Sequence, residues 1–370
     1  MKSLLFGDHR SPHVHRWSEF LEAVEVEVFT VGYGESHAPD TYSYRKLLDR
    51  SGRTATLWGK LRSFLDDLLL IRKENPDFLS VHFLTARYAA LMLLSARPSI
   101  LSCWGSDILI DMPASRGFSR LIRRAALRKA THITCDSDEV RNAIVSEVPG
   151  SEARISLVFW GIDLSKFCVS AREEYSARAI REELALPPSA IVLLSNRLAS
   201  PNYRIKELIE RFRASIRSVD THLVVRFQPG AESGYVQSCK EAAAGDERIH
   251  YLERPLADAE MPALYAACDA ALHFPLSDAT PVSMLEAFAS GCAVICSDAL
   301  DSYKVLENDY HILRLPLAEL DDKGIETALN LRSRYAEADA GIVRRLHSRE
   351  KTVETLRTII AKLKLYGNRA

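Results

Sequence analysis

Short apolar segments alternate with helical stretches along the first half of the chain. The expected strands are residues 3–6, 24–31, 78–84, 99–104 and 132–135. Between them, apolar residues recur at helical spacing over 56–74, 86–96 and 120–130. Strands that alternate with helices usually pair in parallel, so this half predicts a layered α/β domain.

The same pattern restarts in the second half. A helix is expected at 203–216, and strands are expected at 191–196, 222–228, 249–252, 270–274 and 293–298. We therefore predict an α/β protein of two doubly wound domains, 1–167 and 168–348. The segment 349–370 contains an amphipathic helix that we expect to pack back on the first domain. In such sheets ligands bind beyond the carboxyl ends of the strands, so the two domains should face a central cleft.

Composition adds few constraints. The length of 370 residues suits about two domains. A formal net charge of −1 argues against a general nucleic-acid binder. Seven cysteines without a CxxC pair suit reduced thiols in a cytoplasm, and no apolar run is long enough to span a membrane. We expect a cytoplasmic protein. The basic residues of 120–129 are either a solvated helix face or a peripheral contact with the inner membrane face.

The segment SDATPVSMLEAFASGCAVICSD (277–298) contains a helix with an unusual carboxylate. Thr280 suits the N-cap, Pro281 suits the first helical position and Gly291 suits the end. Apolar residues surround this helix almost completely, which predicts burial. A polar stripe of Ser283, Glu286 and Ser290 interrupts them.

Glu286 needs partners, because a lone buried carboxylate costs several kcal/mol. One hypothesis is that it faces a wet cleft and accepts hydrogen bonds from the hydroxyls of a sugar. The other is that it pairs with an internal arginine or lysine. The free N–H groups of 282–284 form a site for phosphate at the positive end of the helix. Together these features suit a nucleotide diphosphate.

The same segment resembles the donor-binding stretch of glycosyltransferase family 4, the retaining enzymes of the GT-B fold. Further similar segments are VFWGIDLSKF (158–167), SNRLASPNYRIKELIERF (195–212), the run 250–278, NPDFLSVHF (75–83) and CWGSDIL (103–109). The resemblance implies two Rossmann-like domains that face a central cleft. It is more specific in the second half than in the first.

The resemblance also implies roles for individual residues. Glu286 would hold the donor ribose, and Asp278, where the family has glutamate, would hold hydroxyls of the transferred sugar. Arg197 would contact the diphosphate. Asn202 stands where the family usually has a second cation, so Arg204 or Lys206 would replace that cation. The donor-binding set also includes Thr280, Pro281, Val282 and Ser283 at the start of the helix. The backbone at Arg254 and Leu256 is implied to contact the base. Gly7 follows the first strand, where a missing side chain would let substrate approach the backbone.

The acceptor is expected on the first domain, near the polar loop 7–17. Asp107 either orients the acceptor or is a helix N-cap or loop hydrogen-bond partner. In the first case the catalytic set would be Asp107, Arg197, Lys206 and Asp278. Trp104 and Trp160 replace a histidine and an asparagine of the family pattern. His82 is either a buried structural histidine or part of the acceptor site. The acceptor-side set is His13, Arg16, His82, Trp104, Gly105 and Asp107.

The resemblance implies a retaining hexosyltransferase that uses a nucleotide diphosphate sugar, with UDP or GDP as the carrier. The acceptor would be a hydroxyl of a glycan or lipid-linked acceptor, in cell-surface polysaccharide synthesis. Neither a cofactor nor a metal is expected, because Asp136, Ser137 and Asp138 suit a helix cap better than a metal site. The alternatives are a non-catalytic two-domain nucleotide-sugar-binding protein, and an epimerase or phosphorylase.

Overall fold

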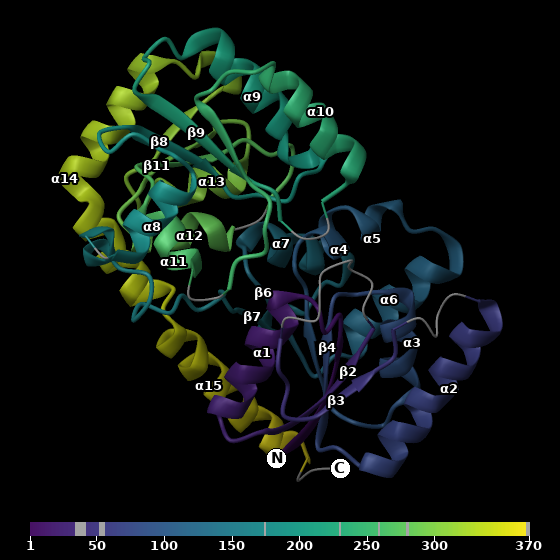
Figure 1. The fold of residues 1–370 in the computed structure, drawn as a ribbon. Helices are drawn as coiled ribbons and strands as arrows, with labels where there is room; N and C mark the ends of the chain where they lie inside the picture. Colours follow the sequence, from purple (N-terminus) through teal and green to yellow (C-terminus); the bar gives the residue numbers. More distant parts are fainter. Residues whose placement is uncertain are drawn as a thin grey trace. The chain divides into compact units, whose positions relative to one another are not determined.

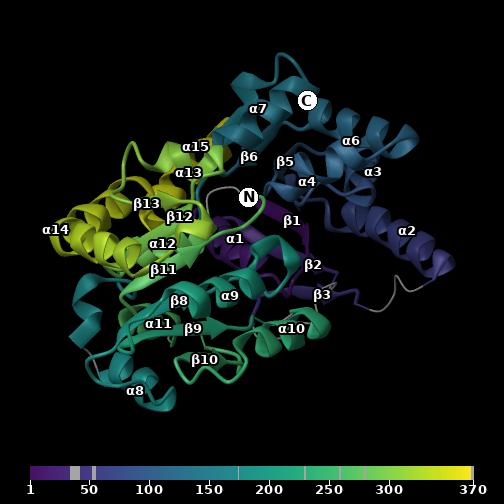
Figure 2. The ribbon, with the colours of Figure 1, turned by 90° about the horizontal axis from the view of Figure 1, so that it is seen from above.

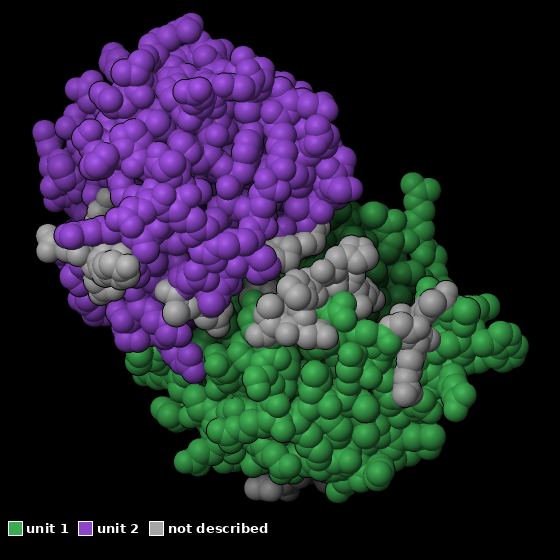
Figure 3. Space-filling view, in the orientation of Figure 1, with its two compact units in different colours: residues 1–160, 350–370 green, residues 161–349 purple. Residues whose placement is uncertain are grey.

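The computed structural model describes residues 1–33, 42–51, 56–173, 175–228, 231–257, 260–278 and 281–367. It divides into two compact units, which Figure 3 colours separately. Unit 1 comprises Met1–Trp160 and Glu350–Ala370, and unit 2 comprises Gly161–Arg349. Each unit has a parallel sheet covered by helices, which confirms the predicted fold class. The chain leaves unit 1 after Trp160, earlier than the expected boundary at 167.

Unit 1 has a seven-stranded sheet in the order β3-β2-β1-β4-β5-β6-β7. Its strands are β1 Lys2–Gly7, β2 Glu27–Gly32, β3 Leu47–Asp49, β4 Phe78–His82, β5 Ser99–Ser102, β6 His132–Cys135 and β7 Ile155–Leu157. Both faces of the central strands are buried, as expected for a parallel sheet. That burial explains why continuous apolar runs located these strands in the sequence.

Helices cover both faces of this sheet (Figure 1). They are α1 Pro12–Ala23, α2 Leu57–Glu74, α3 Ala86–Leu94, α4 Ser106–Leu109, α5 Asp111–Ala114, α6 Gly117–Lys129, α7 Asp138–Glu147 and the 3₁₀ turn Glu152–Arg154. Helix α1 packs on one face, while α2, α3 and α6 cover the other. The strand order reverses between β1 and β4, so the loops that follow these strands form the switch point of the sheet.

Helix α1 corrects the expectation of a loop over 7–17. The helix begins at Pro12, because the Ser11 side chain accepts a hydrogen bond from the His13 N–H (3.2 Å) and caps it. Val24 ends the helix, so β2 starts at Glu27 rather than at 24. His13 and Arg16 therefore lie on a helix.

Unit 2 has a six-stranded sheet, and Figure 2 shows its strands in the order β10-β9-β8-β11-β12-β13. The strands are β8 Ile191–Ser195, β9 Thr221–Arg226, β10 Ile249–Leu252, β11 Ala270–His273, β12 Ala293–Ser297 and β13 Leu313–Leu315. The strand order reverses between β8 and β11. The loops after β8 and β11 therefore lie next to each other at the carboxyl edge, where ligands of doubly wound sheets bind.

Two core layers pack against the faces of this second sheet. One contains residues of α8, α11 and α12, and the other contains residues of α9 and α10. The helices are α8 Tyr175–Glu183, α9 Ile205–Ser215, α10 Ser233–Ala243, α11 Glu260–Ala266, α12 Val282–Ala289, α13 Asp301–Leu306 and α14 Asp322–Leu346. Short 3₁₀ turns occupy Val169–Glu173, Pro201–Tyr203 and Leu317–Glu319.

The chain passes between the units twice, and the two passages are paired within unit 2. Ile162 donates its N–H to the His347 carbonyl (2.8 Å) and accepts from the Arg349 N–H (3.0 Å). The final helix, α15 Arg349–Gly367, then packs its apolar side on unit 1. Leu356 and Ile359 of α15 belong to the same buried cluster as Trp17 of α1.

We predict that Leu356→Ala destabilises unit 1 by about 2–5 kcal/mol, because it leaves a cavity under α15. The exposed neighbour Arg357 is the control, and Arg357→Ala should change stability by less than about 0.5 kcal/mol. All four tryptophans belong to unit 1, so urea unfolding followed by tryptophan fluorescence reports this unit alone. Equal midpoints for the two variants would contradict the packing of α15.

Candidate functional site

The loops at the switch point of unit 2 are joined by Arg197, which follows β8. Its Nη2 donates to Asp278 Oδ2 (2.7 Å), and its Nη1 donates to Ser283 Oγ (2.9 Å). The Arg197 and Asp278 side chains are only 12% and 14% exposed. Burial alone would lower the pKa of Arg197, but the adjacent Asp278 carboxylate raises it, so the guanidinium stays charged. The structure thus brings together three residues of the predicted donor site.

Helix α13 supplies two more contacts to Asp278, which sequence reasoning missed. The Tyr303 hydroxyl donates to Asp278 Oδ2 (2.8 Å), and the Ser302 hydroxyl donates to the Asp278 carbonyl (2.9 Å). Burial and the Asp278 charge raise the pKa of Tyr303 well above its ordinary value, so the phenol remains a donor. Nothing in the local sequence of α13 marks Tyr303, because this contact joins segments that are distant in the chain.

Asn202 stands where the family usually has its second cation, and here it has a structural role. Its side chain donates to the Ser277 carbonyl (3.0 Å), and its own carbonyl accepts from the Leu276 N–H (2.7 Å). Asn202 therefore fixes the loop that carries Asp278 instead of offering a charge. Arg204 precedes α9 in a left-handed conformation (φ 51°), and Lys206 pairs with Glu210 (2.6 Å). The second cation is still a choice between Arg204 and Lys206.

Glu286 lies in the middle of α12 and is 5% exposed, as its helix pattern predicts. The phenol of Tyr265 hydrogen-bonds to this carboxylate. Asn196 Nδ2 donates to the same phenol oxygen (2.9 Å), and Arg226 Nη1 donates to Asn196 Oδ1 (3.0 Å). This relay, which sequence reasoning missed, ties the α12 carboxylate to the end of β8. It therefore places the Glu286 carboxylate near the residue that precedes Arg197.

The start of α12 differs in detail from the expectation. The helix begins at Val282, and Pro281 occupies the cap position instead of the first helical position. The Met284 N–H already bonds to the Pro281 carbonyl (3.0 Å), so it is not one of the free amides. Within the described residues, no side chain caps this helix. Thr280 lies outside those residues, while Gly291 ends the helix region with a φ of 69°, as predicted.

Arg254 and Leu256 follow β10 at the same carboxyl edge of the sheet. Arg254 makes two 2.7 Å contacts with Glu183 and one 2.7 Å contact with Glu260, which joins α8 to α11. Leu256 packs on the core cluster beside α12. These contacts give both side chains structural roles. Recognition of the base by the backbone of these residues stays a prediction.

Gly7 ends β1 in unit 1, where the surrounding packing leaves no room for a side chain. A Cβ atom at this position would lie 2.7 Å from Val14 Cγ2 and 3.2 Å from His82 Cβ. The residue is glycine because α1 packs directly over the strand end. Its contact with the donor stays a prediction.

Aromatic side chains gather at the carboxyl edge of the sheet of unit 1. The rings of Trp104 and Trp160 stack with centroids 3.8 Å apart, and the His13 ring lies 4.2 Å from Trp160. The two tryptophans that depart from the family pattern therefore contact each other. Each large ring gives the other a packing partner.

His82 lies at the end of β4 beneath this cluster and is 1% exposed. Its ring lies 5.0 Å from Trp17 and 5.2 Å from Trp104, and its two nitrogens have no hydrogen-bond partner in the described part of the chain. Burial, with a smaller effect of His13, lowers the pKa of His82 well below its ordinary value. The ring is therefore neutral at pH 7, as suits a buried histidine. Arg16 is half-buried on α1.

Asp107 is fully buried, and both carboxylate oxygens accept backbone hydrogen bonds. Oδ1 accepts from the Trp104 N–H (3.0 Å), and Oδ2 accepts from the Leu84 N–H (2.9 Å). Between Trp104 and Asp107, Gly105 adopts a φ of 103°, which other residues rarely tolerate. This geometry favours Asp107 as the residue that positions the turn, and its contact with an acceptor stays a prediction.

The DSD segment forms a cap, as predicted. Ser137 is the N-cap of α7, and its hydroxyl accepts from the Val140 N–H (3.3 Å). Across the described ranges, no cluster of histidine, cysteine, aspartate or glutamate could hold a metal ion. In the same ranges, no helix is long and apolar enough to cross a membrane.

Comparisons with known proteins agree with this architecture. The model of the glycosyl transferase 4-like family matches residues 2–137, and the model of glycosyl transferases group 1 matches residues 189–323. Each match lies within one unit. No curated protein sequence matches the chain significantly.

Solved structures of low sequence identity share the whole fold. A glycosyltransferase from Rickettsia africae is 12% identical, with a TM-score of 0.77 and 98% of each chain covered. Anabaena HepE in complex with UDP-glucose is 14% identical, with a TM-score of 0.76, and covers 98% of this chain and 100% of its own. Sucrose-phosphate synthase from Thermosynechococcus elongatus is 14% identical, with a TM-score of 0.77, and covers 99% and 100%.

Two parallel-sheet units with these neighbours define a GT-B protein. With both family models matched, the chain belongs to the glycosyltransferases of the family 4 type. The predicted family and fold are thereby confirmed.

Asp107 gives this unit a characteristic pH dependence. Burial raises its pKa from 3.8 to about 6, although the N–H groups of Leu84 and Trp104 oppose the rise. The folded protein therefore retains a proton that the unfolded chain releases. The contribution of Asp107 to stability is full below about pH 4 and is lost as pH rises through about 6.

We predict that Asp107→Asn is less stable than the wild type at acidic pH, because its amide N–H group must face a backbone N–H group. The variant cannot titrate, so the difference between the two proteins should shrink by up to about 3 kcal/mol between about pH 4 and 7. Urea unfolding followed by tryptophan fluorescence measures this difference. A pH-independent difference would contradict it, and Glu27→Gln, at an exposed acidic position of unit 1, is the control.

Proposed function

We propose that the chain is a retaining hexosyltransferase that uses a nucleotide diphosphate sugar and transfers the sugar to a glycan or lipid-linked hydroxyl. The observation that carries this proposal is the junction of Arg197, Asp278 and Ser283 at the carboxyl edge of unit 2, with Glu286 one helical turn further along α12. The Anabaena protein of similar fold was solved with UDP-glucose, which supports UDP as the first carrier to test. GDP is the second.

Each residue of this junction suits one part of such a donor. The diphosphate develops negative charge as the sugar leaves, and the Arg197 guanidinium with the first amides of α12 would stabilise that charge. Glu286 would accept hydrogen bonds from the ribose hydroxyls. Asp278 lies beside Arg197 and would accept hydrogen bonds from hydroxyls of the transferred sugar. Arg204 or Lys206 would supply the second cation.

These residues require no protein nucleophile. In a front-face substitution, the leaving phosphate takes the proton from the acceptor hydroxyl while the C–O bond forms on the same face of the sugar. The configuration is then retained, and the charge that a metal would balance is balanced by Arg197 and its partner cation. We therefore propose metal-independent transfer. Cell-surface polysaccharide synthesis on the cytoplasmic side is the setting we propose.

The acceptor would bind unit 1 at the edge that carries Trp104. This ring is partly exposed and rests on Trp160. An indole face packs well against the C–H face of a sugar, so Trp104, supported by the stacked Trp160 ring, suits a glycan acceptor. Asp107 would act by holding the Trp104 turn in place.

A second candidate function is nucleotide-sugar binding without turnover. The contact that favours it is the direct ion pair between Arg197 and Asp278, because each then occupies a group that the other would offer to a donor. Incubation with UDP-glucose, other UDP-sugars and GDP-sugars, with and without chelator, separates the two functions. Release of free nucleotide that persists with chelator supports the transferase, whereas binding without release supports the second candidate.

We predict that Glu286→Ala lowers the affinity for the nucleoside diphosphate about 10–100-fold, because it removes an ionised acceptor worth about 1.5–3 kcal/mol. Isothermal titration calorimetry with UDP and GDP measures this loss. Ser290→Ala is the matched control on the same buried stripe and should change affinity less than about threefold. Unchanged affinity in a folded Glu286→Ala variant would remove the ribose assignment.

We predict a different result for Asp278→Asn. Its affinity for the nucleoside diphosphate should persist, because Arg197 then loses a competing carboxylate. Sugar release should slow by about 100-fold, because the sugar loses a charged acceptor in the transition state. The exposed Asp298→Asn is the control. Nucleotide affinity that falls together with turnover would show that Asp278 serves the diphosphate site instead.

A further inference from the structure

Helix α2 has apolar side chains on both its inner and its outer side. On the inner side, Phe64, Leu68 and Leu70 are partly buried and pack on the core of unit 1. Ser63, Asp67 and Ile71 are its buried residues. Exposed large side chains on the opposite side are Trp58 (81%), Leu61 (49%), Leu65 (50%) and Leu69 (58%). Their spacing of three and four residues puts them on one continuous stripe. An amphipathic helix normally buries such a stripe, so this orientation needs a cause and a use.

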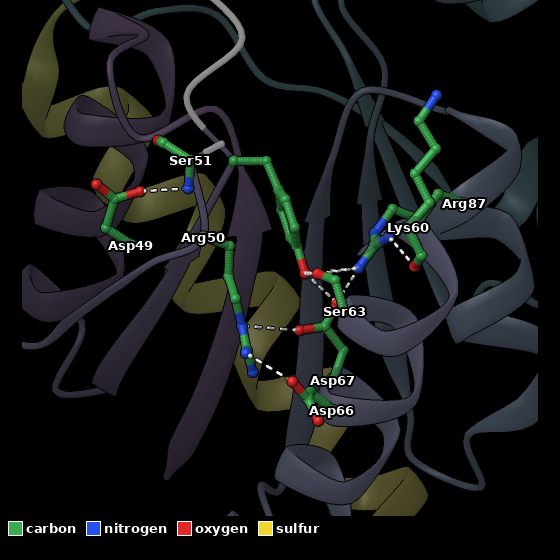
Figure 4. Close-up of polar contacts among 9 residues, drawn as sticks. Asp49, Arg50, Ser51, Lys60, Ser63, Asp66, Asp67 and Arg87 are labelled. Atoms are coloured by element: carbon green, nitrogen blue, oxygen red, sulfur yellow. Dashed lines mark hydrogen bonds and ion pairs between the residues drawn. The ribbon is translucent and has the colours of Figure 1, made fainter. Parts of the chain in front are cut away.

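One cause is a network of charges under α2 (Figure 4). Asp67 is fully buried and accepts from Arg87 Nη2 (2.6 Å) and from the Tyr33 hydroxyl. Arg50 Nε lies 3.5 Å from the other oxygen of the carboxylate, and Arg87 also donates to Ser63 (3.0 Å). Rolling the helix to bury the outer stripe would expose the inner apolar residues. It would also separate these charges, at a cost of several kcal/mol. The network and this packing therefore fix the leucine stripe outward.

The charges of α2 are divided between its two sides. Its acidic residues are held inside unit 1: Asp66 pairs with Arg50 (3.3 Å), Asp67 is in the network, and Glu74 pairs with Lys2 (2.6 Å). Arg62, Arg72 and Lys73 are exposed on the same side as the stripe, by their helical spacing. Among the described residues, these three form no ion pair. The outward face is therefore apolar and cationic.

The basic helix α6, which the sequence suggested as a lipid contact, differs in this respect. Arg120 pairs with Glu147, Arg124 donates to the Glu147 carbonyl, and Lys129 donates to two backbone carbonyls of the segment around Ser95. Several of its cations thus stabilise unit 1 itself. Helix α2 keeps its outward cations available.

We propose that α2 lies in the surface of an anionic lipid bilayer and docks unit 1 there. Trp58 and the leucines would enter the boundary of head groups and acyl chains, while Arg62, Arg72 and Lys73 would contact the anionic head groups. A second copy of the chain fits this face less well, because self-pairing would bring its cations together without an acidic partner. This inference goes beyond the proposed function, since docking needs neither donor nor turnover.

The placement also bears on the acceptor. In a parallel sheet, a helix between two strands starts at the carboxyl edge, so the Trp58 end of α2 lies at the edge that carries the Trp104 turn. If the proposed function holds, a docked unit 1 would meet a lipid-linked acceptor from the membrane surface. This step alone depends on the proposed function.

Vesicle co-sedimentation of the full chain tests the docking. The wild type should bind vesicles of phosphatidylcholine mixed with phosphatidylglycerol, bind pure phosphatidylcholine much less, and lose binding as salt is raised. Leu65→Gln combined with Leu69→Gln should bind the mixed vesicles at least about tenfold less. Arg62→Gln combined with Lys73→Gln should also bind less and lose most of the salt dependence. Val219→Gln, at an exposed position (76%) of unit 2, is the control.

Three results would overturn the proposal. They are no binding of the wild type to the mixed vesicles, equal binding by the leucine variant, and a wild-type dimer that the leucine variant converts to a monomer in light scattering. The last result would assign the stripe to self-association. Circular dichroism checks that the variants are folded, and removal of exposed leucines should leave the thermal midpoint unchanged. Failure of docking would leave donor binding and sugar release unaffected, so the two proposals are tested separately.

Discussion

The requirement that a buried carboxylate be satisfied shapes every functional region of this protein. Taking such a group out of water costs several kcal/mol, which only specific partners offset. The chain meets this requirement in different ways: Asp278 with a guanidinium and a phenol, Asp107 with two backbone amides, Asp67 with two arginines, and Glu286 with a phenol relay. Each solution joins segments that are distant in the sequence. Each therefore fixes the position of a loop or helix.

The sequence predicted the central strands, because parallel strands are buried on both faces and form continuous apolar runs. It missed β3, β7 and β13, which have three residues each and are less buried. It also predicted the buried α12 and its polar stripe, because eight residues of that helix contain their own pattern. It failed at α1, where the histidines and Arg16 resemble a polar loop although Ser11 caps a helix. It also missed Tyr265 and Tyr303, whose value comes only from contacts across the fold.

The departures from the family pattern are informative when they are considered in pairs. Trp104 and Trp160 lie far apart in the sequence, and each alone looks like the loss of a polar residue. In space their rings stack at the carboxyl edge of the sheet of unit 1, with Trp160 buried and Trp104 partly exposed. Asn202 is similar: it lacks the charge of the family cation but holds Ser277 and thereby the loop that carries Asp278. The changes thus keep the architecture while altering what the edge presents.

Helix α2 shows where periodicity reaches its limit. The spacing of three and four residues correctly predicts a helix, but the spacing does not determine which side of the helix faces the core. A hydrophobic stripe of Trp58, Leu61, Leu65 and Leu69 would normally decide the orientation. Here the inner side decides it, because a roll would remove the partners of Asp67 and would expose Phe64 and Leu68, which pack on the core. The same orientation of the helix turns Arg62, Arg72 and Lys73 outward. The contacts of Asp67 on the inner side and the exposed residues on the outer side of α2 therefore follow from one orientation of the helix.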